Sequence, residues 1–414
     1  MKKIDLNKVN NAQDIMRQLF NGKGTFVEIH KLRSVGPTLL NRDGNGNAKT
    51  VKFGGEIRTV VSSQCRKAAI RGIELEKKTE RTRCVSDYVA DKIKEICPEV
   101  SDQYLDMAKK ITLTLFGGAG EGKDKIKTVV SVSDTEIHRI ASKILEYFAV
   151  DKEIVVFNKK GEIDTTQKEY TDVATDLARL ATNSQLDYEI AMFGRMSTNN
   201  VIRSVDSSTF YNFAYTTNVS ASDSDYFTAQ DTFRKAFENA QLGAGHLDER
   251  DMNAGCYYSY AGIALTTYFE NVLIAVDYSN KEELKERIKK AVDYLVDIVW
   301  ASIMIMPTTM QHQMASFPDP QCVYATIKTG AQNMTYDKIF EKPVYADRNY
   351  SVGEQSVQRL IKAINYNKFD MYAYDKRYWI GEDAMVPNNT ASVDLKGMLD
   401  DMKGYFYETF GIEA

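Results

Sequence analysis

The residue types best suited to chemistry lie between Leu40 and Arg71, in a loop rich in glycine and asparagine and in the segment after it. Ser62 and Ser63 stand where a helix N-cap belongs, ahead of a run typical of a helix. The first turn of a helix leaves backbone N–H groups unpaired and carries the positive end of the helix dipole, so it attracts anions. We therefore expect an anion-binding site at the start of this helix.

Basic side chains surround the expected site. Gln64, Lys67 and Arg71 follow one another at spacings that place them on one face of the helix. Arg42 and Lys49, on the preceding loop, can close over the same backbone. The arrangement suits contacts with successive phosphates of a nucleic acid. A solvated basic helix face after an ordinary loop would show the same pattern, so the residues alone leave both interpretations open.

The positive charge is concentrated in this part of the chain. Over the whole sequence, 53 Lys and Arg stand against 57 Asp and Glu, which gives a net charge of −4. Between Arg42 and Arg83, eleven Lys and Arg stand against five Asp and Glu, a local excess of six positive charges. The overall charge argues mildly against a general nucleic-acid coat protein, and the basic stretch favours a defined anion-binding track. Two glycines in the stretch, Gly54 and Gly55, would let a polymer approach the main chain closely.

Other patterns that could support catalysis are incomplete. The four histidines are scattered and lack the spacing of a zinc-binding helix, and the five cysteines contain no CxxC pair. The run Gly117-x4-Gly122-Lys123 resembles a P-loop, but Asp124 stands where a P-loop needs Ser or Thr. We therefore expect no catalytic site, no metal and no cofactor. No signal peptide and no apolar run long enough to span a bilayer can be read, so a cytoplasmic location is expected.

We call the segment Leu40–Arg71 the basic track. Hydropathy patterns predict the elements that would position it. Alternation over Thr25–Leu32 predicts a first strand, and strand-like sequence returns at Asp187–Phe193 and at Cys256–Tyr268. Lys281–Trp300 carries the apolar stripe of an amphipathic helix, and a final helix is predicted at Ser392–Phe410. Strands and helices of this kind predict an α+β core.

Two insertions are expected to interrupt that core. Residues from about 72 to 185 are charged and mostly helical in pattern, and Ser133 and Glu136 have the spacing of a capping box. From Asp206 to Arg250 the chain is polar but studded with aromatic residues. Such a composition predicts an extended arm that packs on a partner instead of on its own core.

Several sequence blocks also carry a resemblance to a known family. The basic track contains LNRD, FGG and SSQ in that order, and a lysine and an arginine follow. Further blocks are FGRMSTN at Phe193–Asn199, SDYFTAQD at Ser224–Asp231 and AGCYYSYAGIAL at Ala254–Leu265. On these blocks, which span residues 26 to about 268, the chain resembles the CasC (Cas-seven) family of crRNA-binding backbone subunits of type I-E CRISPR Cascade. The remainder matches that family only loosely.

The resemblance implies an α+β fold shaped like a hand, with an RRM-like (ferredoxin-like) palm, an inserted helical fingers domain and an extended β-hairpin-like thumb. The implied division is palm with an N-terminal lead at 1–71, fingers at 72–185, palm at 186–205, thumb at 206–250, palm at 251–345 and a C-terminal helical docking segment at 346–414.

The resemblance also implies roles for individual residues. The implied RNA-binding residues are Arg42, Lys49, Ser62, Ser63, Gln64, Lys67, Arg71, Arg195, Met196, Ser197 and Thr198, and the implied thumb wedge is Phe227 and Thr228. In the family, the wedge and the residue matching Met196 surround a flipped-out base. Phe227 could stack on a base and Met196 could act as a soft apolar wedge, although plain hydrophobic anchors would read the same way.

The expected function is that of a repeated scaffold without catalysis. The chain would bind the crRNA spacer as a head-to-tail helical filament and support pairing of the guide with target DNA in segments. Its expected partners are crRNA, target DNA, further copies of itself and other Cascade subunits, with no membrane.

Two alternatives remain open from the sequence. Backbone subunits of related RNA-targeting effector complexes cleave target RNA with a loop aspartate, and Asp43 would be the candidate here. A generic single-strand RNA-binding module would instead coat any RNA equally and would need no sibling subunits.

Overall fold

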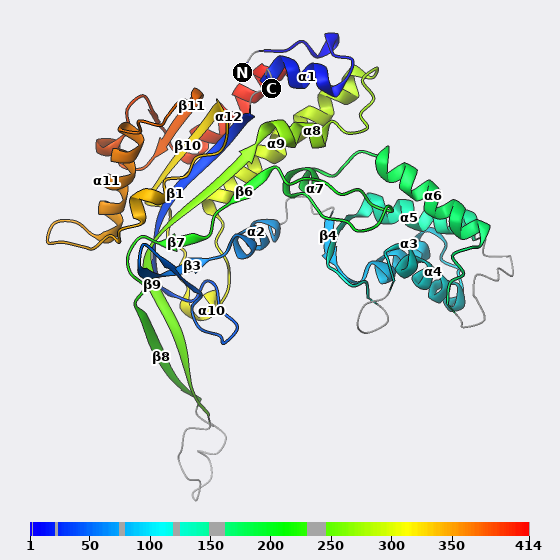
Figure 1. Ribbon diagram of the computed structural model, residues 1–414, viewed down its shortest axis with the longest axis horizontal. Helices are drawn as coiled ribbons and strands as arrows, with labels where there is room; N and C mark the ends of the chain where they lie inside the picture. Colours follow the sequence, from blue (N-terminus) through cyan, green and yellow to red (C-terminus); the bar gives the residue numbers. More distant parts are fainter. Residues whose placement is uncertain are drawn as a thin grey trace, which may run out of the picture.

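A large, mostly antiparallel sheet forms the centre of the molecule (Figure 1). The computed structural model describes residues 1, 3–20, 24–73, 79–118, 125–148, 162–229 and 246–413. The main strand order is β12-β11-β10-β1-β9-β7-β3-β2, and β6 and β8 also pair with β9. The middle strands are β1 (Gly24–Thr38), β6 (Thr209–Tyr211), β7 (Ala214–Thr216), β9 (His246–Ala264) and β10 (Cys322–Gly330).

These middle strands follow a simple connection pattern. The chain runs from β1 through α2 to β6 and β7, returns along β9, and passes through α8 and α9 to β10. β1 lies between β9 and β10 and is antiparallel to both. The result is the order strand, helix, strand, strand, helix, strand in one antiparallel sheet. The helices concerned are α2 (Ser63–Arg71), α8 (Leu265–Val272) and α9 (Lys281–Met304). The α+β class predicted from the sequence is confirmed.

Further strands extend both edges of the sheet. At one edge lie β2 (Thr50–Phe53) and β3 (Glu56–Val61), and at the other β11 (Ala373–Ile380) and β12 (Ala391–Ser392). β11 pairs antiparallel with β10, and β12 adds one short parallel pair. The segment after residue 346, expected to be helical, therefore also supplies sheet strands.

Helices cover the two faces of the sheet with two separate cores. One face carries α1 (Ala12–Phe20), α8, α9 and α12 (Leu395–Phe410). The other carries α11 (Val352–Asn365) and a 3₁₀ turn, η3 (Asp337–Phe340). Because successive residues of a strand point to opposite faces, alternate side chains of β1 enter the two cores. The remaining short elements are η1 (Leu6–Lys8), α10 (Gln311–Met314) and η4 (Asp383–Met385).

The helical insertion forms a unit with its own core, beside the sheet (Figure 1). Its elements are β4 (Thr79–Thr82), α3 (Val85–Ile96), α4 (Asp102–Leu115), β5 (Val130–Ser133), α5 (Asp134–Tyr147) and α6 (Lys168–Thr182). The predicted capping box is present at the start of α5, where Ser133 and Glu136 exchange both hydrogen bonds. The P-loop-like run at Gly117–Asp124 falls largely outside the described residues.

A long hairpin projects from the end of the sheet (Figure 1). It pairs β8 (Ser222–Ala229) with the first part of β9, in a register from Ser222 opposite Asn253 to Ala229 opposite His246. The first residues of the predicted arm are not part of the projecting hairpin, because they form β6 and β7 within the central sheet. The hairpin therefore starts near residue 222, and residues 230–245 lie outside the described part.

Two strand predictions need correction, the first entirely and the second in part. Asp187–Phe193 forms a helix, α7 (Tyr188–Phe193), which ends at Gly194 with φ 65°. A side chain at Gly194 would come within 2.5 Å of the backbone nitrogen of Ser207, so the close turn requires glycine. The strand predicted at Cys256–Tyr268 ends at Ala264, and the next residues start α8. Short apolar runs fit a buried strand and a buried helix equally well, which explains both errors.

Lys281–Trp300 is confirmed as part of a longer helix whose apolar stripe is fully buried. Within the described residues, no helix combines the length and apolar character needed to cross a membrane.

Candidate nucleic-acid interface

Hydrogen bonds tie the loop of the basic track to the start of α2. Ser62 is the N-cap of the helix, and its hydroxyl accepts a hydrogen bond from the backbone N–H of Cys65 at 3.3 Å. The backbone N–H of Ser62 donates to Asn41 Oδ1 at 2.9 Å, and the N–H of Lys49 donates to the Asn41 carbonyl at 2.9 Å. The loop and the helix start therefore form one structure, as the sequence predicted for Ser62.

Two lysines of the track lie over aromatic rings. Lys49 Nζ lies 5.7 Å from the centre of the Phe213 ring, and Lys67 Nζ lies 5.6 Å from that of Tyr211. Both rings come from β6 and the turn after it, a segment that the sequence assigned to the arm. The alternating pattern TFYNFAYT was the available signal for a strand there. The ammonium groups themselves face the rings, and both lysines are half-buried. Among the described residues neither forms an ion pair, so both charges can still attract an anion.

Arg42 and Gln64 are exposed, and Ser63 is half-buried with its hydroxyl 3.3 Å from Gln64 Oε1. Among the described residues, Arg42 has no ion pair, so its guanidinium is free. Lys67 has its pKa lowered by burial and by the nearby charges of Arg71 and Arg66. Burial and neighbouring positive charges both disfavour the charged form of a lysine, so the lowered pKa reflects the crowded basic surroundings of Lys67.

Two arginines of α2 bind other parts of the protein. Arg66 Nη1 donates to the carbonyls of Asn212 and Tyr260, both at 2.9 Å. Arg71 Nε lies 3.2 Å from Glu189 Oε1, and the guanidinium sits 4.4 Å from the centre of the Phe193 ring. Arg71 therefore joins the end of α2 to α7, and it is only partly available to a ligand.

The two glycines of the track differ in their surroundings. At Gly54 a side chain would meet the carbonyl oxygen of Glu341 at 1.8 Å, so the chain itself requires glycine there. At Gly55 nothing lies within 4 Å, and the position is open. Only Gly55 can offer a close backbone approach to a polymer.

Arg195 is buried and fully engaged, which removes it from the predicted RNA contacts. Its Nη1 donates to Glu136 Oε2 at 2.6 Å and to the Ser131 carbonyl at 3.0 Å, and its Nε donates to the Arg203 carbonyl at 2.7 Å. The side chain is 2% exposed. The implied role of Arg195 is corrected: it joins the helical insertion to the segment after α7.

Of the three residues after Arg195, Met196 and Thr198 are exposed and Ser197 is half-buried. Met196 is 83% exposed. Thr198 is exposed, and the Ser197 N–H donates to Ser204 Oγ at 2.8 Å. Because Arg71 ties α2 to α7, this segment follows directly from an element attached to the basic track.

The hairpin residues predicted to form a wedge point to opposite faces. In a strand, neighbouring side chains alternate, so Phe227 lies on one face of β8 and Thr228 on the other with Tyr226. Phe227 is half-buried beneath the Arg250 guanidinium, whose carbon lies 4.1 Å from the ring centre. Tyr226 is 64% exposed, so it is the aromatic residue of this pair that is free to stack. Sequence reasoning missed it.

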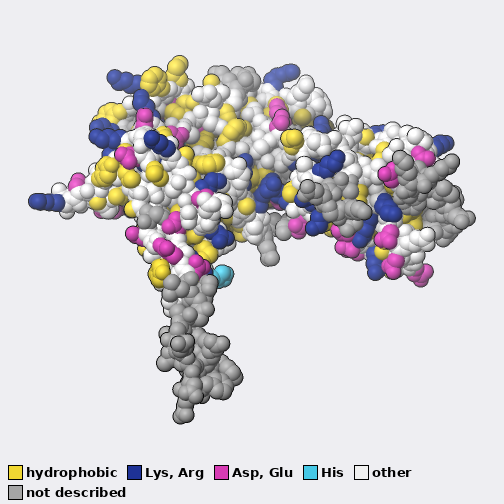
Figure 2. Space-filling model, turned by 60° about the horizontal axis from the view of Figure 1, so that its bottom comes forward, with side chains coloured by type: hydrophobic (Ala, Val, Ile, Leu, Met, Phe, Trp, Pro, Cys, Tyr) yellow, Lys and Arg dark blue, Asp and Glu magenta, His cyan; other side chains and the backbone are white. Residues whose placement is uncertain are grey.

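The track also reaches the base of the hairpin. The N–H of Ala48 donates to Asp251 Oδ2 on β9 at 3.2 Å. Ala48 thus links the track to the hairpin, and Arg71 links it to α7. The track therefore lies between the hairpin and residues 196–198, which follow α7. Figure 2 shows Lys and Arg side chains gathered on the surface between the sheet and the helical insertion.

The face that an RNA-recognition sheet normally offers to bases is covered in this molecule. Tyr258 and Tyr260 on β9 and His30 on β1 are 0%, 3% and 1% exposed beneath α11 and η3. His30 Nδ1 hydrogen-bonds Tyr258 Oη at 3.0 Å, and Tyr260 Oη donates to Glu28 at 2.9 Å. These aromatic residues therefore build the core and cannot stack on bases.

Asp43 shapes its own loop. Its Oδ1 accepts hydrogen bonds from the N–H groups of Asn45 at 2.8 Å and Asn47 at 3.0 Å. Within the described part of the chain, no three His, Cys, Asp or Glu side chains are placed to hold a metal ion. The geometry assigns Asp43 to the loop turn.

Comparisons with known proteins identify the family. A model described as "CT1975-like protein" matches residues 27–403. A chain of a solved "CRISPR RNA-guided surveillance complex, pre-nicking" is similar with a TM-score of 0.72 and 23% identity, covering 92% of this chain and 100% of that one. A chain of another "CRISPR RNA-guided surveillance complex" has a TM-score of 0.61 and 20% identity, covering 91% and 100%. A search of the curated proteins finds no match.

These findings correct one expectation. The resemblance to the type I-E CasC family is wrong as a family assignment, because the model that matches is the CT1975-like one. The similarity to the two solved chains, both below 25% identity, concerns the fold. Because the matching model spans most of the sequence, the chain belongs to the family of CT1975-like proteins.

Proposed function

We propose that the chain is a crRNA-binding backbone subunit of a CRISPR RNA-guided surveillance complex. The observation that carries the proposal is the basic track, where free Arg42 and aromatic-supported Lys49 and Lys67 surround the capped start of α2. The fold supports it, since it resembles chains of such complexes over more than nine tenths of this sequence.

In this proposal the RNA backbone runs over the start of α2. The proposed contacts are Arg42, Lys49, Ser62, Ser63, Gln64 and Lys67, with Arg71 contributing in part. Phosphate contacts position a strand without reading its sequence, so any spacer would be accepted. Bases would not stack on the sheet, because α11 and η3 cover that face. They would meet Met196 and the exposed face of the hairpin instead.

The parts of the molecule take hand-like roles in the proposal. The sheet with its covering helices is an RRM-like palm, the unit from β4 to α6 forms the fingers, and the β8–β9 hairpin is the thumb. The hairpin projects too far from the sheet to pack on its own core (Figure 1). A projecting element that docks on the next copy gives a heterologous, head-to-tail contact, and such contacts build helical filaments. Each thumb would then divide the guide–target DNA duplex into segments.

Crosslinking tests the proposed path of the RNA. Ultraviolet light is applied to the full chain bound to a guide-length single-stranded RNA, and crosslinked peptides are identified by mass spectrometry. The proposal expects crosslinks in residues 41–71, at Met196 and in the hairpin. Crosslinks confined to α11 or to the helical insertion would contradict it.

RNA cleavage by Asp43 is the second candidate function, and the structure gives it little support. Metal-dependent cleavage needs several ligands around the ion, and among the described residues no group of three His, Cys, Asp or Glu side chains could hold one. Incubation of target RNA with the loaded complex and Mg²⁺ tests this directly. Cleavage that disappears in Asp43→Ala but persists in the exposed control Lys396→Met would establish the alternative.

A further inference from the structure

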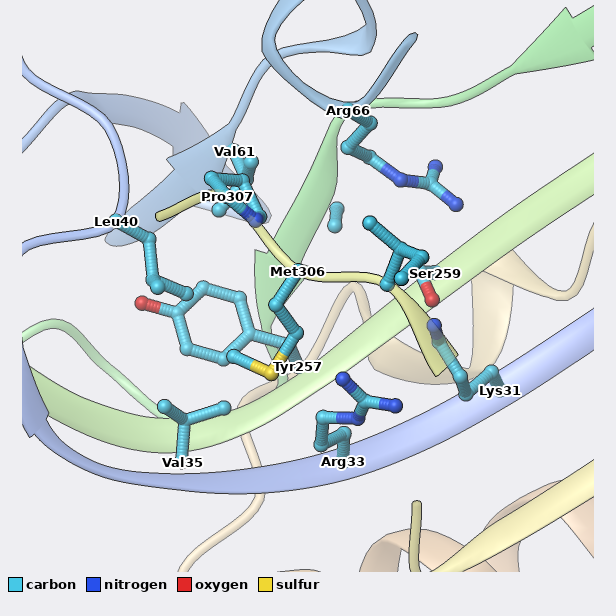
Figure 3. Close-up of a pocket in the computed structure, with 12 residues that line it drawn as sticks. Lys31, Arg33, Val35, Leu40, Val61, Arg66, Tyr257, Ser259, Met306 and Pro307 are labelled. Carbon is cyan, nitrogen blue, oxygen red and sulfur yellow. The ribbon is translucent and has the colours of Figure 1, made fainter. Parts of the chain in front are cut away.

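Three basic side chains meet at a cavity behind the basic track. Lys31 and Arg33 come from β1 and Arg66 comes from α2, and each is less than 10% exposed. In Figure 3 the nitrogen ends of Lys31 and Arg33 turn toward the middle of the cavity beside Ser259, and Arg66 approaches from α2. Buried cations are ordinarily matched by carboxylates, so a group of three needs an explanation.

Backbone carbonyl groups satisfy part of this charge. Lys31 Nζ donates to the carbonyls of Ser302 at 2.9 Å and Ile303 at 2.7 Å, at the end of α9. Arg33 donates to the carbonyls of Ile303 at 2.7 Å and Met304 at 3.2 Å. The C-terminus of a helix carries only about half a negative charge. It can therefore offset only a fraction of the charge of Lys31 and Arg33. Arg66 donates elsewhere, to the neutral carbonyls of Asn212 and Tyr260, and these carry no full negative charge.

The remaining charge has no ionic partner among the residues that the structure describes. None of the three side chains forms an ion pair there, and Asp319 acts on Arg33 only through its field. Arg33 Nε is buried without a hydrogen-bond partner. Burial, followed by the charges of Arg33 and Arg66, lowers the pKa of Lys31 well below its usual value. Burial lowers the pKa of Arg66 to about 10. Of the three groups, Lys31 is the one whose charged form is disfavoured by the other two.

The cavity has room for a small anion. Its volume is about 50 Å³, several times the roughly 10–15 Å³ that a single water needs. Leu40 and Val61, which flank the loop of the basic track, form part of the wall, and Met306 also lines the cavity. An anion in the cavity would therefore sit just beneath the proposed RNA path.

We propose that this cavity is an anion site that takes a phosphate group. A tetrahedral oxyanion accepts hydrogen bonds in several directions, which suits a cavity lined by one ammonium and one guanidinium group from β1 and a second guanidinium group from α2. The phosphate could come from the backbone of the RNA, in which case the inference rests on the proposed function, or from a free phosphate-bearing molecule. Both sources share the same chemistry.

The test measures binding of inorganic phosphate to the full chain, freed of nucleic acid, by isothermal titration calorimetry at constant ionic strength. Wild type should bind saturably. Lys31→Met should weaken binding roughly tenfold or more, the cost of one charge-assisted hydrogen bond to the anion. The exposed control Lys396→Met should match wild type.

A second variant separates the site from the stability of α9, because Lys31→Met also removes two hydrogen bonds at the end of that helix. Ala214→Leu keeps all three cations and fills the cavity, whose wall includes Ala214. It should abolish phosphate binding while circular dichroism shows an intact fold. Absence of saturable binding in wild type, or undiminished binding in the Ala214→Leu protein, would overturn the proposal.

Competition then assigns the source. If phosphate weakens binding of single-stranded RNA more than chloride does at equal ionic strength, the RNA backbone supplies the group. If the two ligands bind independently, the site serves a free phosphate-bearing molecule. Phosphate binding by a chain that binds no RNA would refute the proposed function and leave the anion site standing.

Discussion

Neutralising the two lysines that stand on aromatic rings should weaken RNA binding in a salt-dependent way. Lys49→Met with Lys67→Met removes both charges, and the flexible methionine side chain still packs against Phe213 and Tyr211. The local fold should therefore survive. If each lysine neutralises one phosphate of a single strand, the slope of log affinity against log salt should fall by about 0.7 per lysine, or about 1.4 in total.

The expected change in salt slope can be expressed as a ratio of RNA affinities. Between 50 mM and 200 mM salt, a slope difference of about 1.4 changes the ratio of the two affinities about sevenfold. The advantage of wild type should therefore be about sevenfold larger at the lower salt concentration. Fluorescence anisotropy of a labelled, guide-length single-stranded RNA, measured across this range, gives both slopes.

Two exposed lysines provide a matched control. Lys368→Met with Lys396→Met removes the same charge from positions outside the track. That protein should keep the wild-type slope. If the Lys49 and Lys67 variant keeps the wild-type slope as well, or if the control loses as much, specific phosphate contacts at the start of α2 are refuted.

Three further predictions follow from individual contacts. Arg195→Met leaves Glu136 buried without its partner and should lower the free energy of unfolding by about 3–5 kcal/mol in urea denaturation, whereas RNA affinity at 10 °C should be unchanged. Tyr226→Ala should weaken RNA binding by about 1–3 kcal/mol if the exposed ring stacks on a base; an equal loss for double-stranded RNA, which offers no unstacked base, would contradict that role. Burial alone would raise the pKa of Glu28, but His30 and Lys328 outweigh it, so the pKa is lowered from its usual value of 4.5. Ionised Glu28 therefore adds stability above pH 4.5, and this stability is lost as the pH falls through the folded pKa. Glu28→Gln should flatten this acid limb of stability, measured by thermal melting between pH 7 and pH 3; an acid limb unchanged from wild type would contradict the assignment.

Local signals in the sequence predicted the start of the track well. Ser62 caps α2, and Ser133 and Glu136 form the predicted capping box, because capping depends on a few neighbouring residues. The apolar stripe of α9 was also readable, since it repeats over many turns. Such features are encoded locally and need no knowledge of the tertiary fold.

Features that depend on distant partners could not be predicted. Arg195 looked like an exposed RNA ligand, but Glu136, 59 residues earlier, buries it in an ion pair. β11 joins the sheet only because β10 offers it an edge. The anion site needs β1, α2 and the end of α9 together. The family assignment failed for a related reason: short blocks such as FGG and SSQ specify a loop and a helix start, and that local physics is insufficient to distinguish one family from another.

The central claim is that this chain holds guide RNA within a surveillance complex. The most direct measurement is to express the tagged protein with its sibling subunits, with and without a CRISPR array, and to sequence the RNA that copurifies. The proposal predicts one uniform, array-derived RNA together with the siblings, and its loss when the array is absent. Recovery of random cellular RNA, or of none, with the siblings present would contradict the claim and favour a generic single-strand binding module.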